Sequence, residues 1–346
     1  MKDTEQIRFF LGSNSPLGFF SRFDQLTDPH RMRRLFVIKG GPGGGKSTLM
    51  RKVAQSVREL GDPVEYIHCS SDADSLDAVI FPVQGAAVVD GTRPHFIEPK
   101  YWGVFETIVP LFACLDEQQL CCRREEIIAL TDQCSRAHEQ CCRFLAAAGA
   151  VQADTARIVS SFTNTEKIHR LAARLAAREF RPAGGQPGRE SVRMLSAVSD
   201  QGLFLFDDTA PHLAERICLV EDEYGVSGKT LLSDLRDLAL AAGHDVITCY
   251  CPLAPAEKID HLFIPALSLG FMTANRFLQP HVEPYKVINA RRFTDAGELR
   301  AHRSRLTFNR KILSQMLSEA AEMVAEAKEI HNEIEKYYVS AMNFSM

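Results

Sequence analysis

The sequence predicts an α/β protein made of two tandem units, each with a parallel sheet and a long helical extension. A glycine-rich segment, FVIKGGPGGGKSTLM at 36–50, follows an aliphatic run and opens an amphipathic one. A related segment, CLVEDEYGVSGKTLL, recurs at 218–232. Two long seams of apolar residues are spaced alternately by three and four. These three observations indicate a strand–loop–helix unit that occurs twice in one chain.

The repeat extends well beyond the two glycine-containing segments. FLGSNSPLGFFSRFD (10–24) matches MLSAVSDQGLFLFDD (194–208), and SLDAVIFP (75–82) matches KIDHLFIP (258–265). PHFIEPKY (94–101) is echoed by PHVEPYK. Matches in the same order along the chain indicate an internal duplication. We place the boundary in the Gly/Pro-rich segment RPAGGQPGRES, which gives units at 1–185 and 186–346.

Each unit shows the same order of expected elements. A short hairpin-like segment comes first, and a buried strand follows, LFVIKG in the first unit and ICLVED in the second. Next come a loop, an amphipathic helix and a second strand, at 64–69 or 246–251. Strand, helix and strand in this rhythm predict a parallel sheet with right-handed crossovers.

The remainder of each unit is predicted to be a helical arm, at about 104–180 and about 296–340. Alternating spacings of three and four are typical of helices packed side by side. Residues 154–180 are interpreted as a return helix for the first seam. The arms serve either as structural packing or as a lever that docks a protein partner. The seam residues are Ile127, Leu130, Cys134, Ala137, Cys141, Phe144, Ala148 and Val151, then Leu313, Met316, Ala320, Met323, Ala327, Ile330, Ile334 and Tyr337.

The first glycine-rich segment satisfies the pattern G-x-x-x-x-G-K-[ST] between a strand and a helix, the context that this motif requires. Its backbone N–H groups and the helix N-terminus are expected to cradle the phosphates of ATP. Lys46 would lie between the β- and γ-phosphates, Ser47 would bind Mg²⁺, and Thr48 would contact the α-phosphate. The predicted nucleotide-binding residues are Gly40, Gly41, Pro42, Gly43, Gly44, Gly45, Lys46, Ser47 and Thr48. The fold class is accordingly two tandem P-loop NTPase-like units.

Three carboxylates are candidates for the chemistry beside Lys46. Asp90 ends the apolar run GAAVVD and is our choice for a second magnesium ligand and a catalytic residue. The alternative is that Asp90 only starts an Asp-Gly turn. Asp72 and Asp74, in CSSDADS, are candidate bases for a phosphoryl acceptor or else members of a capped polar loop.

Arg93, Arg33 and Arg34 are candidates to supply positive charge for a transition state, but a role as a surface charge or a salt-bridge partner is favoured for each. His95 and His281 follow proline at matching positions in the two units. Their presence in both copies favours a structural hydrogen-bonding role.

The second glycine-containing segment keeps Gly228, Lys229 and Thr230 but has Glu223 in place of the first glycine, after two further acids. A polyphosphate there would meet uncompensated negative charge. The position that corresponds to Asp90 is Thr273, at an offset of 183 residues. We therefore expect no ATP hydrolysis at the second site, with Lys229 neutralising the neighbouring acids.

Composition restricts the remaining function classes. The net charge is −4, and there is no basic stripe, which argues against a nucleic-acid partner. No apolar run approaches a membrane span and no secretion signal is seen, so a cytoplasmic location without a membrane partner is expected. The ten cysteines form no CxxC pair, and most are interpreted as small buried apolar residues.

Several segments together resemble a bacterial family of duplicated P-loop proteins, whose members are described as ATPases or as nucleotide-kinase-like. The resemblance rests on RFFLGSNSPLGFFSRFDQL, IKGGPGGGKSTLM, HCSSDADSLDAVIFP, VVDGTRPHFIEPKY and AKEIHNEIEKYYVSAMNF. It covers nearly the whole chain and implies ATP binding at residues 40–48. The second copy departs from the P-loop pattern at Glu223, so the resemblance does not carry a second active site.

Three functions are compatible with these features. The first is an ATPase that acts at the first loop and transmits its state through the helical arms. The second is a small-molecule or nucleotide kinase with Asp72 or Asp74 as base. The third is a non-enzymatic adaptor whose conformation is set by nucleotide binding. No N-K-x-D segment of a guanine-specific site is found.

Overall fold

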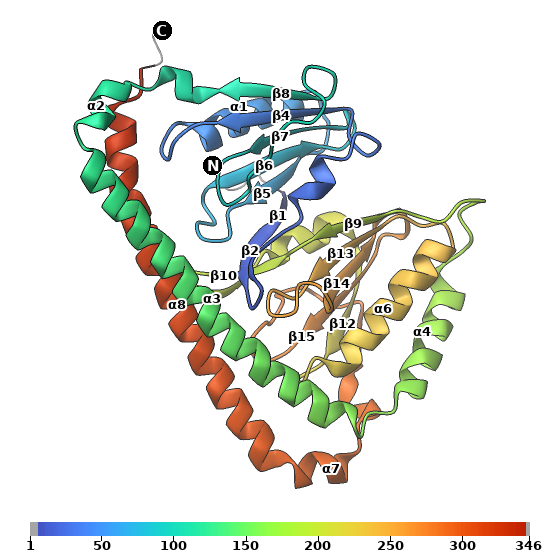
Figure 1. Cartoon of the computed structure of the whole chain (residues 1–346). Coiled ribbons are helices and arrows are strands. Elements are labelled where there is room, and N and C mark those ends of the chain that lie inside the picture. Colours follow the sequence, from blue (N-terminus) through green and yellow to red (C-terminus); the bar gives the residue numbers. More distant parts are fainter. Residues whose placement is uncertain (1–5, 344–346) are drawn as a thin grey trace.

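The computed structural model describes residues 6–343, which form two six-stranded sheets joined by long helices (Figure 1). The first unit contains β1 (Ile7–Phe9), β2 (Gly12–Ser15), β3 (Gly18–Ser21), β4 (Arg34–Lys39), α1 (Lys46–Glu59), β5 (Glu65–His68), β6 (Leu76–Phe81), β7 (Ala86–Asp90), β8 (Glu106–Pro110), α2 (Glu117–Cys121) and α3 (Arg124–Ser160). After α4 (Thr165–Glu179), the second unit contains β9 (Glu190–Arg193), β10 (Ser196–Ser199), β11 (Gly202–Leu205), α5 (Ala210–Leu213), β12 (Arg216–Glu221), α6 (Val226–Ala241), β13 (Val246–Tyr250), β14 (Ile259–Ile264), β15 (Leu269–Ala274), β16 (Lys286–Asn289), α7 (Ala296–Ala301) and α8 (Arg303–Ser340).

The two sheets have the same strand order, β1-β5-β6-β7-β4-β8 and β9-β13-β14-β15-β12-β16. The α/β class is therefore confirmed, and so is the hairpin that opens each unit, β2–β3 and β10–β11. The expectation of purely parallel sheets is wrong. β6 and β14 run antiparallel to both of their neighbours. The connection from β5 to β6 is too short for a crossover helix, so the chain returns as a hairpin.

A shared irregularity supports the duplication at the level of single residues. The pairing of β5 with β6 shifts between Ile67 and His68, so that Asp77 is bulged out of register. The pairing of β13 with β14 shifts in the same way between Cys249 and Tyr250, and the bulged residue is Asp260. Bulges turn a side chain away from the regular pleat and often lie beside functional sites.

The inner faces of the two sheets share one hydrophobic core. Its fully buried residues include Phe9, Phe10 and Leu35 from the first unit, and Phe263 and Met272 from the second. The units also meet through a reciprocal backbone pair. Phe10 N–H donates to Met194 O at 2.8 Å, and Met194 N–H donates to Phe10 O at 3.0 Å. These two residues occupy matching positions in the repeat, so the pair marks a local twofold relation.

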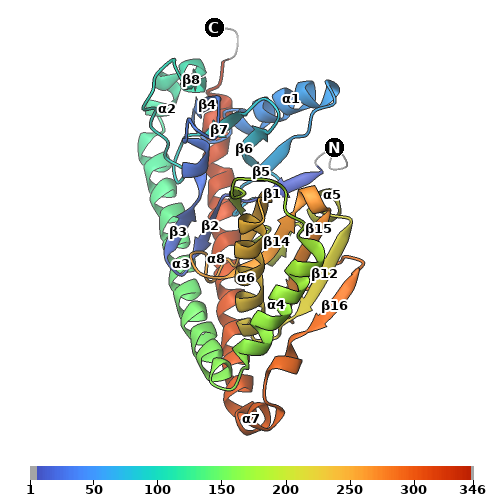
Figure 2. The ribbon, with the colours of Figure 1, turned by 90° about the vertical axis from the view of Figure 1, so that its right-hand side faces the viewer.

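The outer face of each sheet is covered by the helix that follows the glycine-containing loop. α1 packs on the first sheet through Met50 and Ala54, and α6 packs on the second through Leu231 and Leu235. In the second unit a further helix, α4, lies against α6 (Figure 2). The interpretation of residues 154–180 as a return helix for the first seam is therefore wrong.

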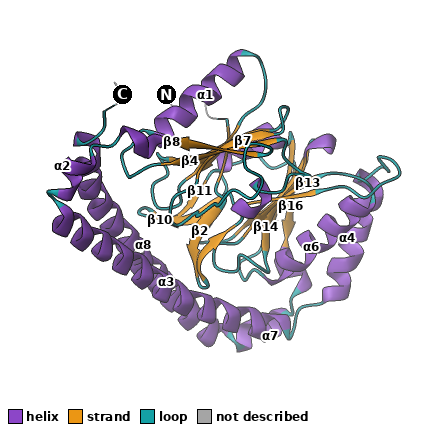
Figure 3. Ribbon diagram, turned by 45° about the horizontal axis from the view of Figure 1, so that its top comes forward, coloured by secondary structure: helices purple, strands orange, loops and turns teal. Residues whose placement is uncertain are grey.

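The two long helices α3 and α8 pair with each other along one side of the molecule (Figure 3). Contacts from Cys134 to Ala327 and from Asp154 to Asn309 show that the pair is antiparallel. Small side chains such as Ala148 and Ala320 are fully buried in it. The heptad pattern identified the apolar faces correctly. Because each seam covers the other, these faces are not available to a separate protein partner.

Two further findings concern the burial of the cysteines and the hydropathy of the helices. Of the ten cysteines, Cys141, Cys218, Cys249 and Cys251 are buried, whereas Cys121 and Cys122 are exposed, so the interpretation as buried apolar residues holds for only part of the set. Among residues 6–343, no helix is both long and apolar enough to cross a membrane.

Candidate functional site

The first loop, residues 40–45, connects β4 to α1 at the carboxyl end of the strand. Gly43 and Gly45 have φ values of 63° and 78°, in the left-handed region that favours glycine. A Cβ on Gly44 would lie 3.0 Å from Gly41 O, so the chain passes close to itself there. Such a turn directs successive N–H groups toward one point, the geometry of an anion-binding nest at a helix N-terminus.

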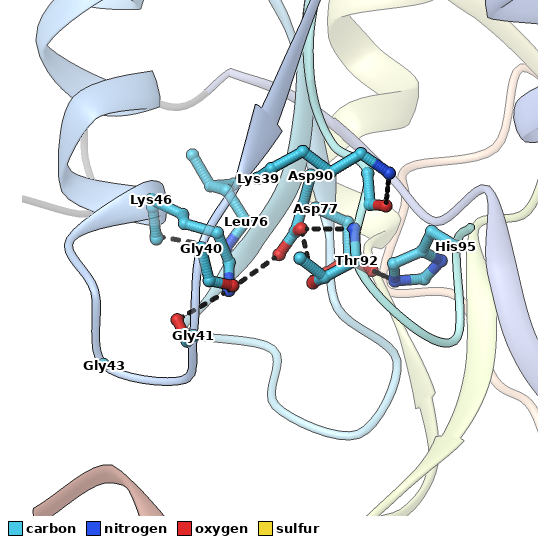
Figure 4. A network of polar contacts seen from close by, with 12 residues as sticks. Lys39, Gly40, Gly41, Gly43, Lys46, Leu76, Asp77, Asp90, Thr92 and His95 are labelled. Atoms are coloured by element: carbon cyan, nitrogen blue, oxygen red, sulfur yellow. Dashed lines mark hydrogen bonds and ion pairs between the residues drawn. The ribbon is translucent and has the colours of Figure 1, made fainter. Parts of the chain in front are cut away.

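Lys46 is the first residue of α1, and its ammonium group reaches back across the loop (Figure 4). Nζ donates to Gly40 O at 3.1 Å and to Gly41 O at 3.0 Å. It also forms an ion pair with Asp90 Oδ2 at 3.3 Å, with both side chains largely buried. An ammonium group has three donors, so these contacts account for all of them.

Asp90 is the last residue of β7, which runs parallel to β4 with Asp90 opposite Ile38. This register places the carboxylate beside the start of the first loop, as predicted for a residue that ends the neighbouring strand. Oδ1 accepts from Thr92 N–H at 2.9 Å and from the Thr92 hydroxyl at 2.6 Å. Both oxygens of Asp90 are thus engaged within the protein.

Ser47 is held by donors from two directions. Its Oγ accepts from the Arg51 guanidinium at 2.6 Å and from Leu76 N–H at 3.1 Å. A metal ion at this hydroxyl would therefore have to replace Arg51. Thr48 lies in the same helical turn and is exposed, and Pro42 is half-buried in the loop.

Asp72 and Asp74 lie in the loop between β5 and β6, and the ion pair of Lys46 is made with Asp90 rather than with either of them. Asp72 accepts from the Ser75 hydroxyl at 2.6 Å and forms an ion pair of 3.1 Å with Lys328 of α8. Burial raises the pKa of Asp72, but Ser75 and Lys328 outweigh it and hold that pKa below its ordinary value. The Asp74 carbonyl accepts from Arg51 at 2.5 Å. This loop therefore joins α1 to α8.

The arginines suggested for charge stabilisation lie elsewhere. Arg34 starts β4, at the end opposite to the first loop, and donates to Gly103 O at 2.9 Å. Arg33 packs against Gly85 at the same end. Strand direction separates both from the first loop and both are exposed, so the interpretation as surface charges, which we favoured, agrees with the structure. Arg93 lies in the segment after β7 and is exposed.

The structure adds a part that sequence reasoning missed, the last turns of α8. The first loop donates Gly43 N–H to Glu335 Oε1 at 3.0 Å. A Cβ on Gly41 would lie 2.4 Å from the Tyr338 ring, and one on Gly43 would lie 2.7 Å from Val339. Nothing local in the sequence indicated this contact, because Glu335 is 292 residues from Gly43.

Glu335 belongs to a short polar chain between the long helices. His331 Nε2 lies 3.5 Å from Glu335 Oε1, and this contact is the main reason that the pKa of Glu335 is below its ordinary value. The pKa of His331 rises to about 9, chiefly through Cys134 of α3 and then through Glu335. An ionised carboxylate thus lies against an N–H group of the first loop.

The second loop, residues 222–225, is shorter than the first, and α6 starts directly after Gly225. Gly225, with φ 73°, occupies the place that Gly45 has before α1. Asp222 Oδ1 accepts from Gly225 N–H at 3.1 Å, and Oδ2 accepts from Gly228 N–H at 2.6 Å. A carboxylate of the chain itself therefore takes the N–H groups that would otherwise face a bound anion.

Lys229 does not neutralise the acids of the second loop, in contrast to our expectation. It lies within α6 rather than at its start, and its Nζ pairs with Glu257 at 3.1 Å on the surface. The loop is instead accompanied by Lys258, which is buried and pairs with Asp260 at 2.5 Å. Burial disfavours the charged lysine, but Asp260 outweighs it and raises the pKa of Lys258. Thr273 occupies the position of Asp90, as the alignment predicted.

The two bulged aspartates have different partners. Asp77 pairs with His95 at 2.8 Å, and both are buried near Asp90 (Figure 4). Burial lowers the pKa of His95, but the negative charge of Asp77 outweighs it and the net pKa is raised. His281, the match of His95, is exposed and contacts Asp207 at 2.9 Å. The two histidines therefore do not share one structural role.

Comparison with known proteins gave no match: no family model fits the chain, and no similar curated protein or solved structure was found.

Proposed function

We propose that this protein binds ATP with Mg²⁺ at residues 40–48 and hydrolyses it, and that the second loop does not take part in turnover. The observation that supports this most directly is the ion pair between Lys46 and Asp90, 3.3 Å long, at the carboxyl ends of adjacent parallel strands. A lysine after a glycine-rich turn and an aspartate on the next strand are the groups that P-loop NTPases use for phosphates and metal.

The residues of the first loop fit a polyphosphate. Gly43 and Gly45 adopt conformations that direct the backbone N–H groups inward, and no side chain of residues 43–45 occupies the space. Lys46 and the N–H groups of the loop would hold the phosphates, and Ser47 with Asp90 would hold the metal. Bound Mg²⁺ would neutralise charge that develops on the transferred phosphoryl group.

Nucleotide binding at this site would compete with contacts that the protein makes to itself. A phosphate would need the Gly43 N–H group, which now donates a hydrogen bond to Glu335. Two anions at one donor repel each other. ATP is therefore expected to displace the last turns of α8 from the first loop. This displacement links nucleotide state to the long helix pair, as a nucleotide-gated adaptor would require.

The kinase alternative has less support. Asp72 is already committed to Ser75 and Lys328, and the Asp74 segment contacts Arg51. The ammonium group of Lys46 pairs with Asp90 instead. The two residues considered as the base of a kinase therefore have other partners, which leaves this alternative with less support than hydrolysis.

The test is a measurement of phosphate release from Mg·ATP by the full chain, together with the melting temperature with and without nucleotide. Release without any added acceptor supports hydrolysis. ADP formation that appears only with a metabolite library would favour the kinase. A rise in melting temperature without turnover would leave the adaptor function alone, and no effect of ATP on either readout would overturn the proposal.

A further inference from the structure

A large cavity is lined by residues of the second loop and of α7. The helix α7 lies at one end of the molecule (Figure 1). The volume of the cavity is about 1360 Å³. The walls come from the second loop, from the last turns of α3, from the segments after β13 and β15, and from the first half of α8. Cavities that hold small ligands in proteins have volumes of roughly 300–1,000 Å³, so this one has room for a nucleotide-sized molecule.

The rim of the cavity carries a concentration of positive charge. The cationic residues on it are Arg291, Arg300, Arg303, Arg310 and Lys311. Within residues 6–343 none of these five forms an ion pair, whereas other arginines of the chain do, such as Arg216, Arg276 and Arg305. The acidic residues of the lining are Glu223, which is paired with Arg276, and Asp260, which is paired with Lys258. A protein of net charge −4 thus has an unneutralised cationic hollow.

The spacing along α8 shows how the positive charge is organised. Arg303, Thr307 and Arg310 follow one another at intervals of four and three, so they share one face of the helix, and all three line the cavity. Arg305, on another face, pairs with Asp154 at 3.1 Å instead. Like charges placed together without counterions repel one another, and a bound anion would relieve that cost.

Other residues of the lining are less exposed and of a different character. Tyr224, Phe277 and Leu278 contribute aromatic and aliphatic surface, and Asn275 contributes an amide. Lys258 and Asp260 form a buried ion pair that belongs to the same lining. A lining that combines exposed cations with apolar side chains suits a molecule that carries anionic groups together with a flat or apolar group.

We propose that this cavity binds a small ligand that carries two or more phosphate groups, and that arginine side chains rather than loop amides hold it. The N–H groups of Gly225 and Gly228 already donate hydrogen bonds to Asp222, so the second loop itself offers no anion nest. Arginine forks bind phosphate oxygens without a metal ion. Binding here is therefore independent of Mg²⁺, unlike binding at residues 40–48.

The shape of the charged region favours a small molecule over a polynucleotide. A strand of nucleic acid follows an extended positive track. Here the cations gather in one hollow between α7, α8 and the second loop. Further along α8 the helix carries acidic residues such as Glu319, Glu322 and Glu326, so the positive surface does not continue in that direction.

The experiment uses the full chain with Lys46→Ala, which removes the lysine of the first loop. Inorganic tripolyphosphate is titrated calorimetrically in EDTA. The expected result is saturable binding that weakens at least ten-fold on adding Arg303→Ala with Arg310→Ala. Arg305→Ala, on the same helix but outside the cavity, is the matched control and is expected to stay within two-fold. Melting temperatures verify that each variant folds, and Arg303→Lys with Arg310→Lys keeps the charge if the alanine pair does not fold.

Three outcomes would overturn the proposal: no binding in EDTA, equal weakening by the Arg305→Ala control, or displacement of tripolyphosphate by a single-stranded oligonucleotide more strongly than by ATP at equal phosphate concentration. Because the first loop is disabled in every sample, the result does not depend on whether residues 40–48 hydrolyse ATP.

Discussion

The two glycine-containing loops occupy the same place in two sheets of identical strand order, yet the carboxylates that accept their N–H groups come from different parts of the chain. The first loop spans residues 40–45, and its Gly43 N–H group is met by a carboxylate from a distant helix. The second spans residues 222–225 and is closed by its own Asp222. The comparison teaches that a Gly-Lys-Thr sequence does not by itself make an anion site. Loop length and the origin of the capping carboxylate decide whether a ligand has access.

The helices that pack against the two loops also differ in the chemistry of their contacts. At the first loop the end of α8 presents Glu335, which accepts a hydrogen bond from the N–H group that a phosphate would need under the proposed function. At the second loop the end of α3 presents Ile158 and Val159, which pack with Val226. A polar contact can exchange with a ligand, whereas an apolar one stays closed because exposing it to water is unfavourable.

The largest expected contrast is between the two lysines. Lys46→Ala is expected to reduce ATP turnover by more than about 100-fold, since a charge aligned with the transferred phosphoryl group is lost. Lys229→Ala is expected to leave turnover within two-fold, because Lys229 only pairs with Glu257 on the surface. Steady-state phosphate release measures both. Equal losses in the two variants would refute the assignment of the active loop.

The next contrast concerns stability rather than activity. Asp222→Ala removes the acceptor of the Gly225 and Gly228 N–H groups, the second of which is buried, and is expected to lower the free energy of unfolding by about 2–4 kcal/mol. Asp222→Asn keeps one acceptor oxygen and is expected to cost about half as much. Urea unfolding followed by circular dichroism measures the difference. A loss below about 0.5 kcal/mol for the alanine variant would show that Asp222 does not cap the loop.

A smaller effect is expected from Glu335. Glu335→Gln removes a negative charge beside the first loop and is expected to tighten ATP binding by roughly three- to ten-fold, the equivalent of about 1 kcal/mol. Glu333→Gln is the matched control, since Glu333 is on the same helix but pairs with Lys336. Calorimetric titration with a non-hydrolysable ATP analogue measures both. Weaker binding in Glu335→Gln would mean that the carboxylate supports the site instead of competing for it.

The smallest expected effect is a pH dependence of stability that arises from Cys134 of α3 and His331 of α8, close to the first loop. Burial raises the pKa of the Cys134 thiol, but His138 and His331 outweigh it and lower that pKa to about 7. Stability from the thiolate is therefore lost as the pH falls through about 7. The pKa of His331 is raised to about 9, so its stabilisation is lost as the pH rises through about 9. The thiolate of Cys134 and the protonated ring of His331 are thus expected to coexist between about pH 7 and pH 9.

Two measurements address this pair. Alkylation of Cys134, followed by peptide mass spectrometry, is expected to reach half its maximal rate near pH 7, and His331→Gln should move that midpoint toward the ordinary thiol value. The melting temperature of the variant at pH 8 is expected to fall by only about 1 °C, because partly exposed pairs contribute little. An unchanged alkylation midpoint in His331→Gln would contradict the pairing.

The sequence predicted the features that depend on local pattern. The position of Lys46 at the helix start and of Asp90 at the end of the adjacent strand followed from the strand–loop–helix rhythm. It did not predict that β6 would run antiparallel, because an apolar run carries no direction. Heptads identified the apolar faces of α3 and α8 but not their partner, since a face can be covered by any complementary helix.

The second loop shows a different limit. Aligning Lys229 with Lys46 hides the fact that residues 222–225 make a shorter turn than residues 40–45. With that shorter turn α6 begins at Val226, so Lys229 lies about one turn inside the helix. The acids that seemed only repulsive in the sequence therefore include a hydrogen-bond acceptor, Asp222. Only the structure reveals that the helix start has shifted relative to the Gly-Lys-Thr segment.

The reciprocal pair between Phe10 and Met194 has a consequence for how the two copies can diverge. In an assembly of two identical chains, any substitution near such an axis would be imposed on both sides at once. In one covalently continuous chain each side mutates alone, so one half can give up a site while its twin keeps it and the shared interior stays intact.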